Sequence, residues 1–254
     1  MNNIKSKLLT KTPVLGGWLM TGSPNIGEIM ADAGFDFIVV DMEHTPTNGE
    51  GFYQIILSAK GTGCGVFARL ASCDPVAAKQ VLDMGAAGII VPSVNSPDEA
   101  AQAVAMAKFP PEGIRGASFC RASGFGHYFQ EYFQQHNKEV LVVIMLESIV
   151  ALRQIEAILS TPGIDAALIG PYDLSASMGL AGKLDNPDVV KAQQRILSEC
   201  SRKGIPAGIH VVSVDPNEVL RRVNEGFRFI ACGMDTLFIR EGCRQVLQAM
   251  PQIK

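Results

Sequence analysis

The sequence predicts an α/β protein whose strands close into a parallel barrel. Eight short apolar runs alternate with eight longer segments of helical periodicity. The runs are apolar at nearly every position, which is typical of parallel strands that are buried on both faces. Eight such units within 254 residues match the usual size of a (β/α)8 TIM barrel. We therefore expect a single TIM-barrel domain over residues 1–254.

The apolar runs give the expected strands in chain order. An open, doubly wound sheet is the main alternative, but no G-x-G-x-x-G pattern follows the first run, and the even spacing of the units favours closure. We place the strands at residues 14–20, 35–41, 65–70, 88–94, 140–146, 166–169, 207–212 and 229–232.

Capping residues mark several helix starts between these strands. Ser23 precedes a proline at the first helical position, Asp74 opens "DPVAAKQVLDMG", and Ser96 precedes a segment with acids in its first turn. Other helices are expected at the end of the connection over 110–139, through residue 158, over 187–204, over "DPNEVLRRVNEG" and over 235–250.

Composition predicts a soluble, cytoplasmic enzyme. The 22 basic and 25 acidic residues give a formal net charge of −3 without a basic cluster, so we expect no nucleic-acid partner and no anionic membrane partner. Six scattered cysteines form no C-x-x-C pair, which favours reduced thiols over disulfides or a zinc site. No apolar run approaches the roughly 20 residues that would cross a bilayer.

Polar side chains follow most of the predicted strands. Because the carboxyl ends of barrel strands meet at one mouth, where active sites form, we expect these side chains to lie together. They are Asp41, Glu43 and His44 after the second strand, Arg69 after the third, Glu147 after the fifth, Asp173 after the sixth, His210 after the seventh and Asp235 after the eighth. Asp235 is also a candidate N-cap of the last helix.

Two of these residues suit a divalent metal. Glu147 and Asp173 follow neighbouring strands, and a pair of carboxylates favours Mg²⁺ or Mn²⁺ over zinc. The remaining coordination positions would accept water and the carboxylate and ketone oxygens of a 2-oxo acid. Arg69 could stabilise the enolate oxygen, and His44, oriented by Asp41, could move protons directly or through a water molecule.

A lysine mechanism is disfavoured by the lysine positions. Schiff-base aldolases need a lysine inside the barrel. No lysine of this chain lies within a predicted strand or at its carboxyl end.

The strand ends resemble those of the HpcH/HpaI aldolase family, which are metal-dependent pyruvate aldolases. The matching pieces include "GFDFIVVDMEHTPTN", "VFARL", "PPEGIRG", "MLES" and "IGPYDLSASMG", in the expected order over nearly the whole chain. The resemblance implies a homo-hexameric barrel with helices exchanged between subunits. It implies a divalent cation, Mg²⁺ or Mn²⁺ with Co²⁺ as a further option, and a 2-oxo acid and an aldehyde as the small-molecule partners.

The resemblance also assigns individual residues. It implies Glu147 and Asp173 as metal ligands, His44 paired with Asp41 for proton transfer, and Arg69 for enolate stabilisation. The backbone around Gly170, Pro171 and Tyr172 would hold the pyruvate carboxylate. Asp83 matches an acidic residue that approaches a neighbour's site, although a surface helix charge is an equal alternative.

Three positions depart from the family pattern. Met145 stands where a glutamine is often found, Tyr172 where alanine is common, and His210 where an apolar residue is common. Tyr172 and His210 could reshape the aldehyde side of the pocket. Glu43 is a metal ligand or a structural residue, and Arg121 is a candidate for contact with a substrate carboxylate or phosphate.

Three functions remain open at this point. The leading one is reversible retro-aldol cleavage of a 4-hydroxy-2-oxo acid to pyruvate and an aldehyde. The second is related enolate chemistry, such as oxaloacetate decarboxylation or condensation with another electrophile. The third is an inactive barrel that serves in binding or assembly, which the retention of all the polar strand ends argues against.

Overall fold

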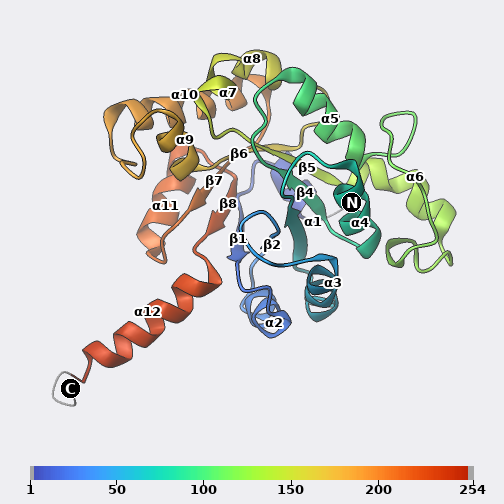
Figure 1. The fold of residues 1–254 in the computed structure, drawn as a ribbon, viewed down its shortest axis with the longest axis horizontal. Helices are drawn as coiled ribbons and strands as arrows, with labels where there is room; N and C mark the ends of the chain where they lie inside the picture. Colours follow the sequence, from blue (N-terminus) through green and yellow to red (C-terminus); the bar gives the residue numbers. More distant parts are fainter. Residues whose placement is uncertain (1–2, 251–254) are drawn as a thin grey trace.

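A computed structural model of the chain, describing residues 3–250, shows a closed barrel (Figure 1). The strands pair in parallel in the order β1 to β8, and β8 closes onto β1. The prediction of a TIM barrel is confirmed. The strands are β1 (Val14–Leu19), β2 (Phe37–Asp41), β3 (Gly65–Arg69), β4 (Gly88–Val91), β5 (Leu141–Met145), β6 (Ala166–Ile169), β7 (Ala207–Val211) and β8 (Phe229–Cys232).

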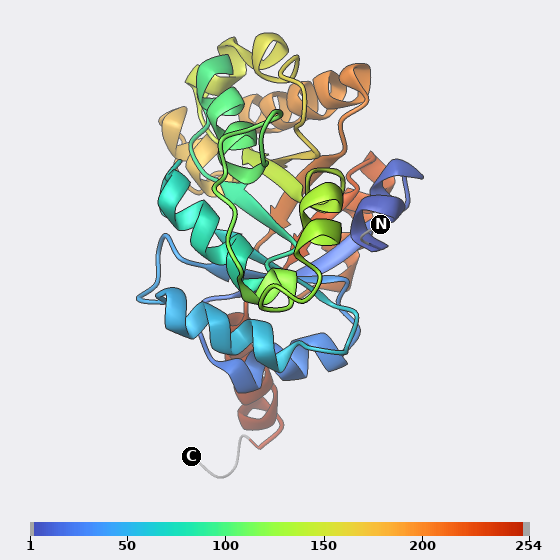
Figure 2. The same ribbon diagram turned by 90° about the vertical axis from the view of Figure 1, so that its right-hand side faces the viewer.

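Helices follow the strands and form the outer ring (Figures 1 and 2). They are α1 (Asn3–Leu9), α2 (Pro24–Asp32), α3 (Gly49–Ser58), α4 (Pro75–Met84), α5 (Pro97–Ala107), the 3-10 turn η1 (Arg121–Ser123), α6 (Phe129–Glu139), α7 (Ile149–Arg153), α8 (Ile155–Ile158), α9 (Pro171–Ser177), α10 (Pro187–Lys203), α11 (Pro216–Glu225) and α12 (Asp235–Gln248). Ser23, Asp74 and Ser96 each accept a backbone N–H as N-caps, as predicted. One expected helix differs, because α7 and α8 divide at Gln154.

Aromatic rings fill the lower part of the barrel. Phe37 stacks on Phe229 with ring centroids 4.3 Å apart, and Phe67 meets both rings edge-on at 5.6 Å. Gly16 makes room for this cluster, since a Cβ atom there would overlap the Phe37 ring. The interior is therefore packed side chain against side chain, and it supports a site only at its upper, carboxyl-terminal end.

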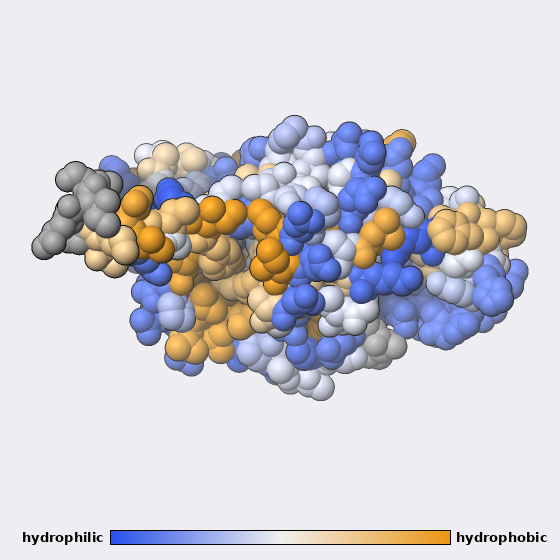
Figure 3. Space-filling view, turned by 90° about the horizontal axis from the view of Figure 1, so that it is seen from below, coloured by the Kyte–Doolittle hydropathy of each residue, from blue (hydrophilic) through white to orange (hydrophobic). Residues whose placement is uncertain are grey.

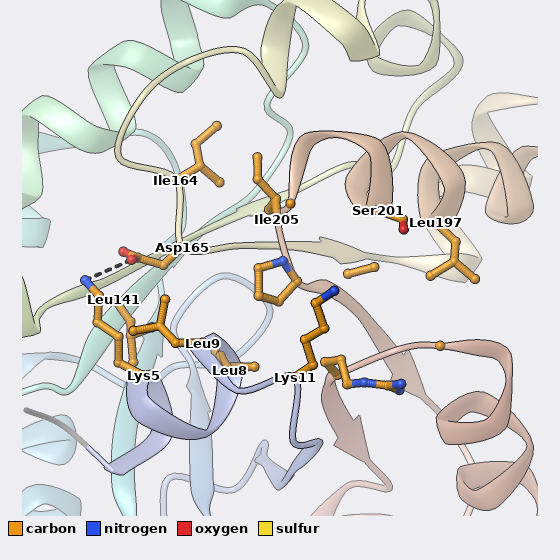
Figure 4. Close-up of a pocket in the computed structure, with 15 residues that line it drawn as sticks. Lys5, Leu8, Leu9, Lys11, Leu141, Ile164, Asp165, Leu197, Ser201 and Ile205 are labelled. Carbon is orange, nitrogen blue, oxygen red and sulfur yellow. Dashed lines mark ion pairs between the residues drawn. The ribbon is translucent and has the colours of Figure 1, made fainter.

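Helix α1 closes the opposite end of the barrel. Its Ile4 and Leu8 are buried in the same interior cluster as Phe37. A cavity of about 440 Å³ lies beside α1, where Lys5 forms an ion pair with Asp165 at 2.8 Å (Figure 4). The sequence did not predict α1, because its seven residues carry only two apolar positions that become buried.

The role predicted for Asp235 as an N-cap is wrong. Met234 occupies the N-cap position of α12 and makes no side-chain cap. Asp235 is 1% exposed and accepts the backbone N–H groups of Met20 and Thr21 at 3.0 Å each, together with the Thr21 hydroxyl at 2.6 Å. Its carboxylate therefore ties the end of β1 to the start of α12.

Helix α12 extends away from the barrel, so that the C-terminal part of the chain projects from one side (Figures 1 and 2). Within residues 3–250, no helix has both the length and the apolar character needed to cross a membrane.

Candidate active site

The alternation of side chains along each strand places polar groups at the upper end of the barrel interior. In β2, Phe37 and Val39 face the packed interior, and Asp41 is the next residue on that face. In β3, Phe67 is followed in the same way by Arg69. The register pairs Asp41 directly with Arg69, and the two therefore meet at the mouth.

Asp41 is fully buried and accepts four hydrogen bonds. Its Oδ1 accepts the backbone N–H groups of Glu43 and His44 at 2.9 Å each, and its Oδ2 accepts Trp18 Nε1 at 3.0 Å and Arg69 Nη2. Burial alone would raise its pKa, but the hydrogen bond and charge of Arg69, with the His44 and Trp18 N–H groups, hold the pKa below its ordinary value. Asp41 is therefore a fixed carboxylate.

Arg69 is held by two carboxylates. Its side chain is 7% exposed, with Nη2 on Asp41 and Nη1 2.9 Å from Glu43 Oε2. The third donor, Nε, is buried without a hydrogen-bond partner among the described residues. An unpaired buried donor is costly, so a ligand oxygen that accepted from it would be favourable.

Glu43, and not Asp41, lies against the His44 ring. Asp41 contacts His44 only through the backbone, whereas Glu43 Oε2 is 3.7 Å from His44 Nε2. Asp41 therefore orients His44 through the backbone of this turn and not through the imidazole ring. The His44 side chain is 58% exposed and open to a ligand. Burial raises the pKa of Glu43, and the charges of Asp41 and Asp173 raise it further. The charge of Arg69 lowers the same pKa but does not outweigh these effects.

Glu147 is a buried carboxylate with one free oxygen. It is 7% exposed, and its Oε1 accepts the Ser93 N–H at 2.7 Å and the Ser93 hydroxyl at 3.3 Å. Its Oε2 has no partner among the described residues. Burial raises the pKa of Glu147 despite the Ser93 N–H, and the charges of Asp173 and Glu43 raise it further. A nearby cation would relieve this cost.

Gly170 brings the backbone of the next strand close to that free oxygen. It is the N-cap residue of α9, which the sequence did not predict as a helix, and Pro171 is its first residue. Asp173 lies in the first turn of α9, close enough for its charge to act on Glu147. Tyr172 is 48% exposed at the same edge.

His210 stacks on Trp18, a residue that the sequence did not single out. Their ring centroids are 4.3 Å apart at an interplanar angle of 13°, and His210 Nε2 lies 3.2 Å from the Gly233 carbonyl oxygen. Burial, supported by the Arg69 charge, lowers the pKa of His210 to about 4. The imidazole is therefore neutral at physiological pH. Trp18 gives no signal in the sequence, because a tryptophan inside an apolar strand reads as a core residue.

Asp83 lies apart from this group. It is in the last turn of α4, and its Oδ1 accepts Arg115 Nη2 at 2.6 Å. Arg121 is on the same side, where its Nη1 donates to the Met84 carbonyl oxygen at 2.8 Å. The structure does not bring either residue to the mouth of its own barrel.

The donor set fits a two-carboxylate metal site. Among residues 3–250, no three His, Cys, Asp or Glu side chains gather as a complete cage. Glu147 with its unpartnered oxygen and Asp173 beside it instead offer two hard oxygen ligands, the donor type that Mg²⁺ and Mn²⁺ prefer. Such a site would leave positions for substrate and water.

Comparisons with known proteins agree with this geometry. The family model described as HpcH/HpaI aldolase/citrate lyase matches residues 15–241. The chain is 35% identical over 246 residues to 5-keto-4-deoxy-D-glucarate aldolase from Escherichia coli O6:H1, covering 96% of this chain and 95% of that protein. The aldolase names of such relatives confirm the prediction of a carbon–carbon lyase.

Solved structures give the same result. The HpcH/HpaI aldolase/citrate lyase family protein from Burkholderia cenocepacia J2315 matches with a TM-score of 0.94 and 32% identity, covering 99% of this chain and 100% of that one. The HpcH/HpaI aldolase from Desulfitobacterium hafniense DCB-2 matches with a TM-score of 0.90 and 27% identity, covering 98% and 96%. With its barrel, its strand-end residues and these matches, the chain belongs to the HpcH/HpaI aldolase/citrate lyase family.

Proposed function

We propose that this protein is a divalent-metal-dependent aldolase that reversibly cleaves a 4-hydroxy-2-oxo acid to pyruvate and an aldehyde. The observation that carries the proposal is the buried, unpartnered Oε2 of Glu147 at the carboxyl-terminal mouth of the barrel. A carboxylate of this kind is retained where a cation compensates it. Glu147 and Asp173 would hold Mg²⁺ or Mn²⁺, with Co²⁺ as an alternative.

The bound cation would supply Lewis acidity toward the 2-oxo group. Arg69 adds positive charge where the enolate oxygen develops, since its Nε is a donor without a partner among the described residues. Asp41 and Glu43 fix the guanidinium from two sides. His44, exposed at the mouth, would take the proton of the 4-hydroxyl group during cleavage and return it during addition.

The remaining contacts would position the two halves of the substrate. The backbone around Gly170, Pro171 and Tyr172 would hold the pyruvate carboxylate, as the family resemblance implies. Tyr172 and His210 would line the aldehyde side. A neutral His210 and a phenol provide polar contacts there, which favours a hydroxylated aldehyde over an alkyl one. The relative named for 5-keto-4-deoxy-D-glucarate acts on a polar substrate of this kind.

A second function uses the same site. Oxaloacetate decarboxylation and enolate condensation need the same cation and Arg69, and the family description joins aldolases with citrate lyases. The two functions differ in the electrophile, so the aldehyde half of the pocket separates them.

Pyruvate release tests the proposal. The purified protein with Mn²⁺ would be given 4-hydroxy-2-oxo acids with hydroxylated or alkyl aldehyde halves, and pyruvate would be followed with lactate dehydrogenase. Oxaloacetate serves as the control substrate. We expect faster cleavage of the hydroxylated series than of the alkyl series or oxaloacetate. Turnover of oxaloacetate alone would support the second function.

Assembly as a homo-hexamer with exchanged helices is part of the proposal. Helix α12 exposes apolar side chains, and apolar surface gathers beside the C-terminal end of the chain (Figure 3). The exposed fractions are 52% for Ile239, 64% for Val246 and 54% for Leu247. Apolar surface of this kind commonly marks an interface. Light scattering should give six times the 27.2 kDa of one chain, and Ile239→Lys should lower that mass; a wild-type monomer would contradict the assembly.

Asp83 has a place in that assembly. The Arg115 ion pair holds its carboxylate at the end of α4, away from the mouth of its own barrel, so any catalytic part would be played in a neighbouring subunit.

A further inference from the structure

Trp18 is the one tryptophan of the chain, and it touches three polar residues of the site. It lies in β1 and is 1% exposed. Its ring stacks on His210, the Arg69 guanidinium carbon lies 5.0 Å from its ring centroid, and its Nε1 donates to Asp41 Oδ2 at 3.0 Å. None of the other aromatic contacts in the described barrel interior involves these residues.

These contacts restrict the orientation of the Arg69 guanidinium in addition to its ion pairs with the two carboxylates. Asp41 Oδ2 is shared between the indole N–H and Arg69 Nη2, so the indole fixes the oxygen that in turn orients the guanidinium. The aromatic face adds a cation–π contact that favours one placement of the planar guanidinium. The Nε donor, which has no partner among the described residues, then has a defined position before any ligand arrives.

We propose that Trp18 is a positioning residue, which holds the Asp41–Arg69 pair and the stacked His210 in the arrangement that binds the 2-oxo acid. The proposal rests on the proposed aldolase function. A residue of this type sets how well the charge of Arg69 matches the developing enolate, so its loss lowers kcat more than it raises KM.

Fluorescence gives the first test, because all tryptophan emission of the protein comes from this position. The full chain with saturating Mg²⁺ would be titrated with oxalate, a planar dianion that resembles the pyruvate enolate. We expect a saturable change in emission intensity or wavelength, and a half-saturation at least about tenfold weaker in Arg69→Lys, whose ammonium cannot match the bidentate geometry. Unchanged emission while calorimetry detects oxalate binding would overturn the proposal.

Substitutions give the second test. Trp18→Phe keeps a ring but removes the N–H donor to Asp41, and Trp18→Leu removes both. We expect kcat for exchange of pyruvate methyl protons to fall roughly tenfold and roughly 100-fold, respectively, with KM changing less than about threefold. Phe37→Leu is the matched control, because it removes a buried ring of the same interior cluster that does not contact Arg69.

The control variant should have a lower Tm and an unchanged kcat. Trp18 variants that lose Tm but keep the wild-type kcat would show that the indole is only a packing residue, which overturns the proposal. Failure of the wild-type protein to exchange pyruvate protons would instead reject the proposed function, and the oxalate titration would still report on Trp18.

Discussion

Glu147 lies so close to Gly170 that a side chain at position 170 would displace its carboxylate. A Cβ atom on Gly170 would be 2.5 Å from Glu147 Oε2, well inside the contact distance of a carbon and an oxygen atom. Met145 of β5 pairs with Leu168 of β6, so the register places Glu147 and Gly170 level with each other beyond the two strands. The backbone angles of Gly170, φ −91° and ψ 95°, suit any residue. Glycine is therefore needed here for the space that it leaves to the free carboxylate oxygen, and not for its backbone freedom.

Gly170→Ala should therefore damage the site without straining the backbone. The new methyl group would displace the Glu147 carboxylate, and we expect Mn²⁺ to bind at least tenfold more weakly, a loss of about 1.4 kcal/mol or more. Isothermal titration with Mn²⁺ measures the effect. Gly116→Ala is the control, because a methyl group there would meet only Lys79 Cδ at 3.9 Å, an ordinary van der Waals contact. Equal Mn²⁺ affinity in Gly170→Ala and wild type would contradict the placement of the cation.

Glu147→Gln should change metal binding and metal-free stability in opposite directions. Burial raises the pKa of Glu147, so its contribution to stability is present at low pH and lost as the pH rises through the folded-state pKa. At pH 7 the metal-free variant should have a Tm equal to or above that of the wild type. Mg²⁺ should raise the Tm of the wild type only, and kcat/KM should fall at least about 100-fold in the variant. Scanning calorimetry with and without EDTA measures the Tm of both proteins. A rise in Tm with Mg²⁺ in both proteins would refute the assignment of Glu147 as a metal ligand.

Asp41→Asn should destabilise the protein far more than Glu43→Gln. Asp41 is fully buried and paired with Arg69, and breaking one partner of such a pair costs roughly 3–5 kcal/mol. Glu43 also contacts Arg69, but its side chain is 22% exposed, so its loss should cost about 1 kcal/mol or less. Urea denaturation at pH 7 compares the two variants. Similar losses in both would mean that Asp41 does not anchor the guanidinium.

Two histidines with lowered pKa values, the buried His136 and the partly buried His210, should make the protein sensitive to acid. Burial and the Arg115 charge lower the pKa of His136 to about 3, and burial lowers that of His210 to about 4. Since both folded-state values lie below the ordinary 6.5, the unfolded chain binds more protons in this window. The free energy of unfolding should therefore fall as the pH drops below 6.5, by up to about 1.4 kcal/mol per pH unit for each histidine.

Urea denaturation between about pH 6.5 and 4.5 measures that slope. His136→Gln removes one of the two groups and should flatten it, whereas His127→Gln is the control, because His127 is exposed to solvent. An unchanged slope in His136→Gln would show that folding does not lower the pKa of His136.

The sequence predicted the barrel well because its signals are local. Apolar runs and prolines after capping residues act within a few residues, and the structure has strands and helices at those places. The sequence does not predict helix α1, because the stability of this helix comes from packing under the barrel and not from its own pattern of apolar residues. Local signals do not encode such tertiary burial.

In the candidate active site, too, local sequence signals predict some features, and the others depend on tertiary contacts. The polar strand ends that the sequence indicates do meet at the mouth, because the two-residue period of strands carries inward-facing residues to it. The N-cap role for Asp235 is wrong, since its partners Met20 and Thr21 lie more than 200 positions away in the chain. For Glu43 the sequence leaves a metal ligand and a structural residue open, and the fold shows its side chain on both Arg69 and His44. Contacts between distant segments need the folded register.

Exchange of pyruvate methyl protons in D₂O tests the central claim most directly, because it reports enolate formation without any aldehyde. NMR would follow the methyl signal with the wild-type protein and Mg²⁺, and again after thorough chelation. We predict exchange that requires the cation and that Glu147→Gln loses. Absence of exchange with the cation present, or equal exchange after its removal, would contradict metal-dependent enolate chemistry at Glu147 and Asp173.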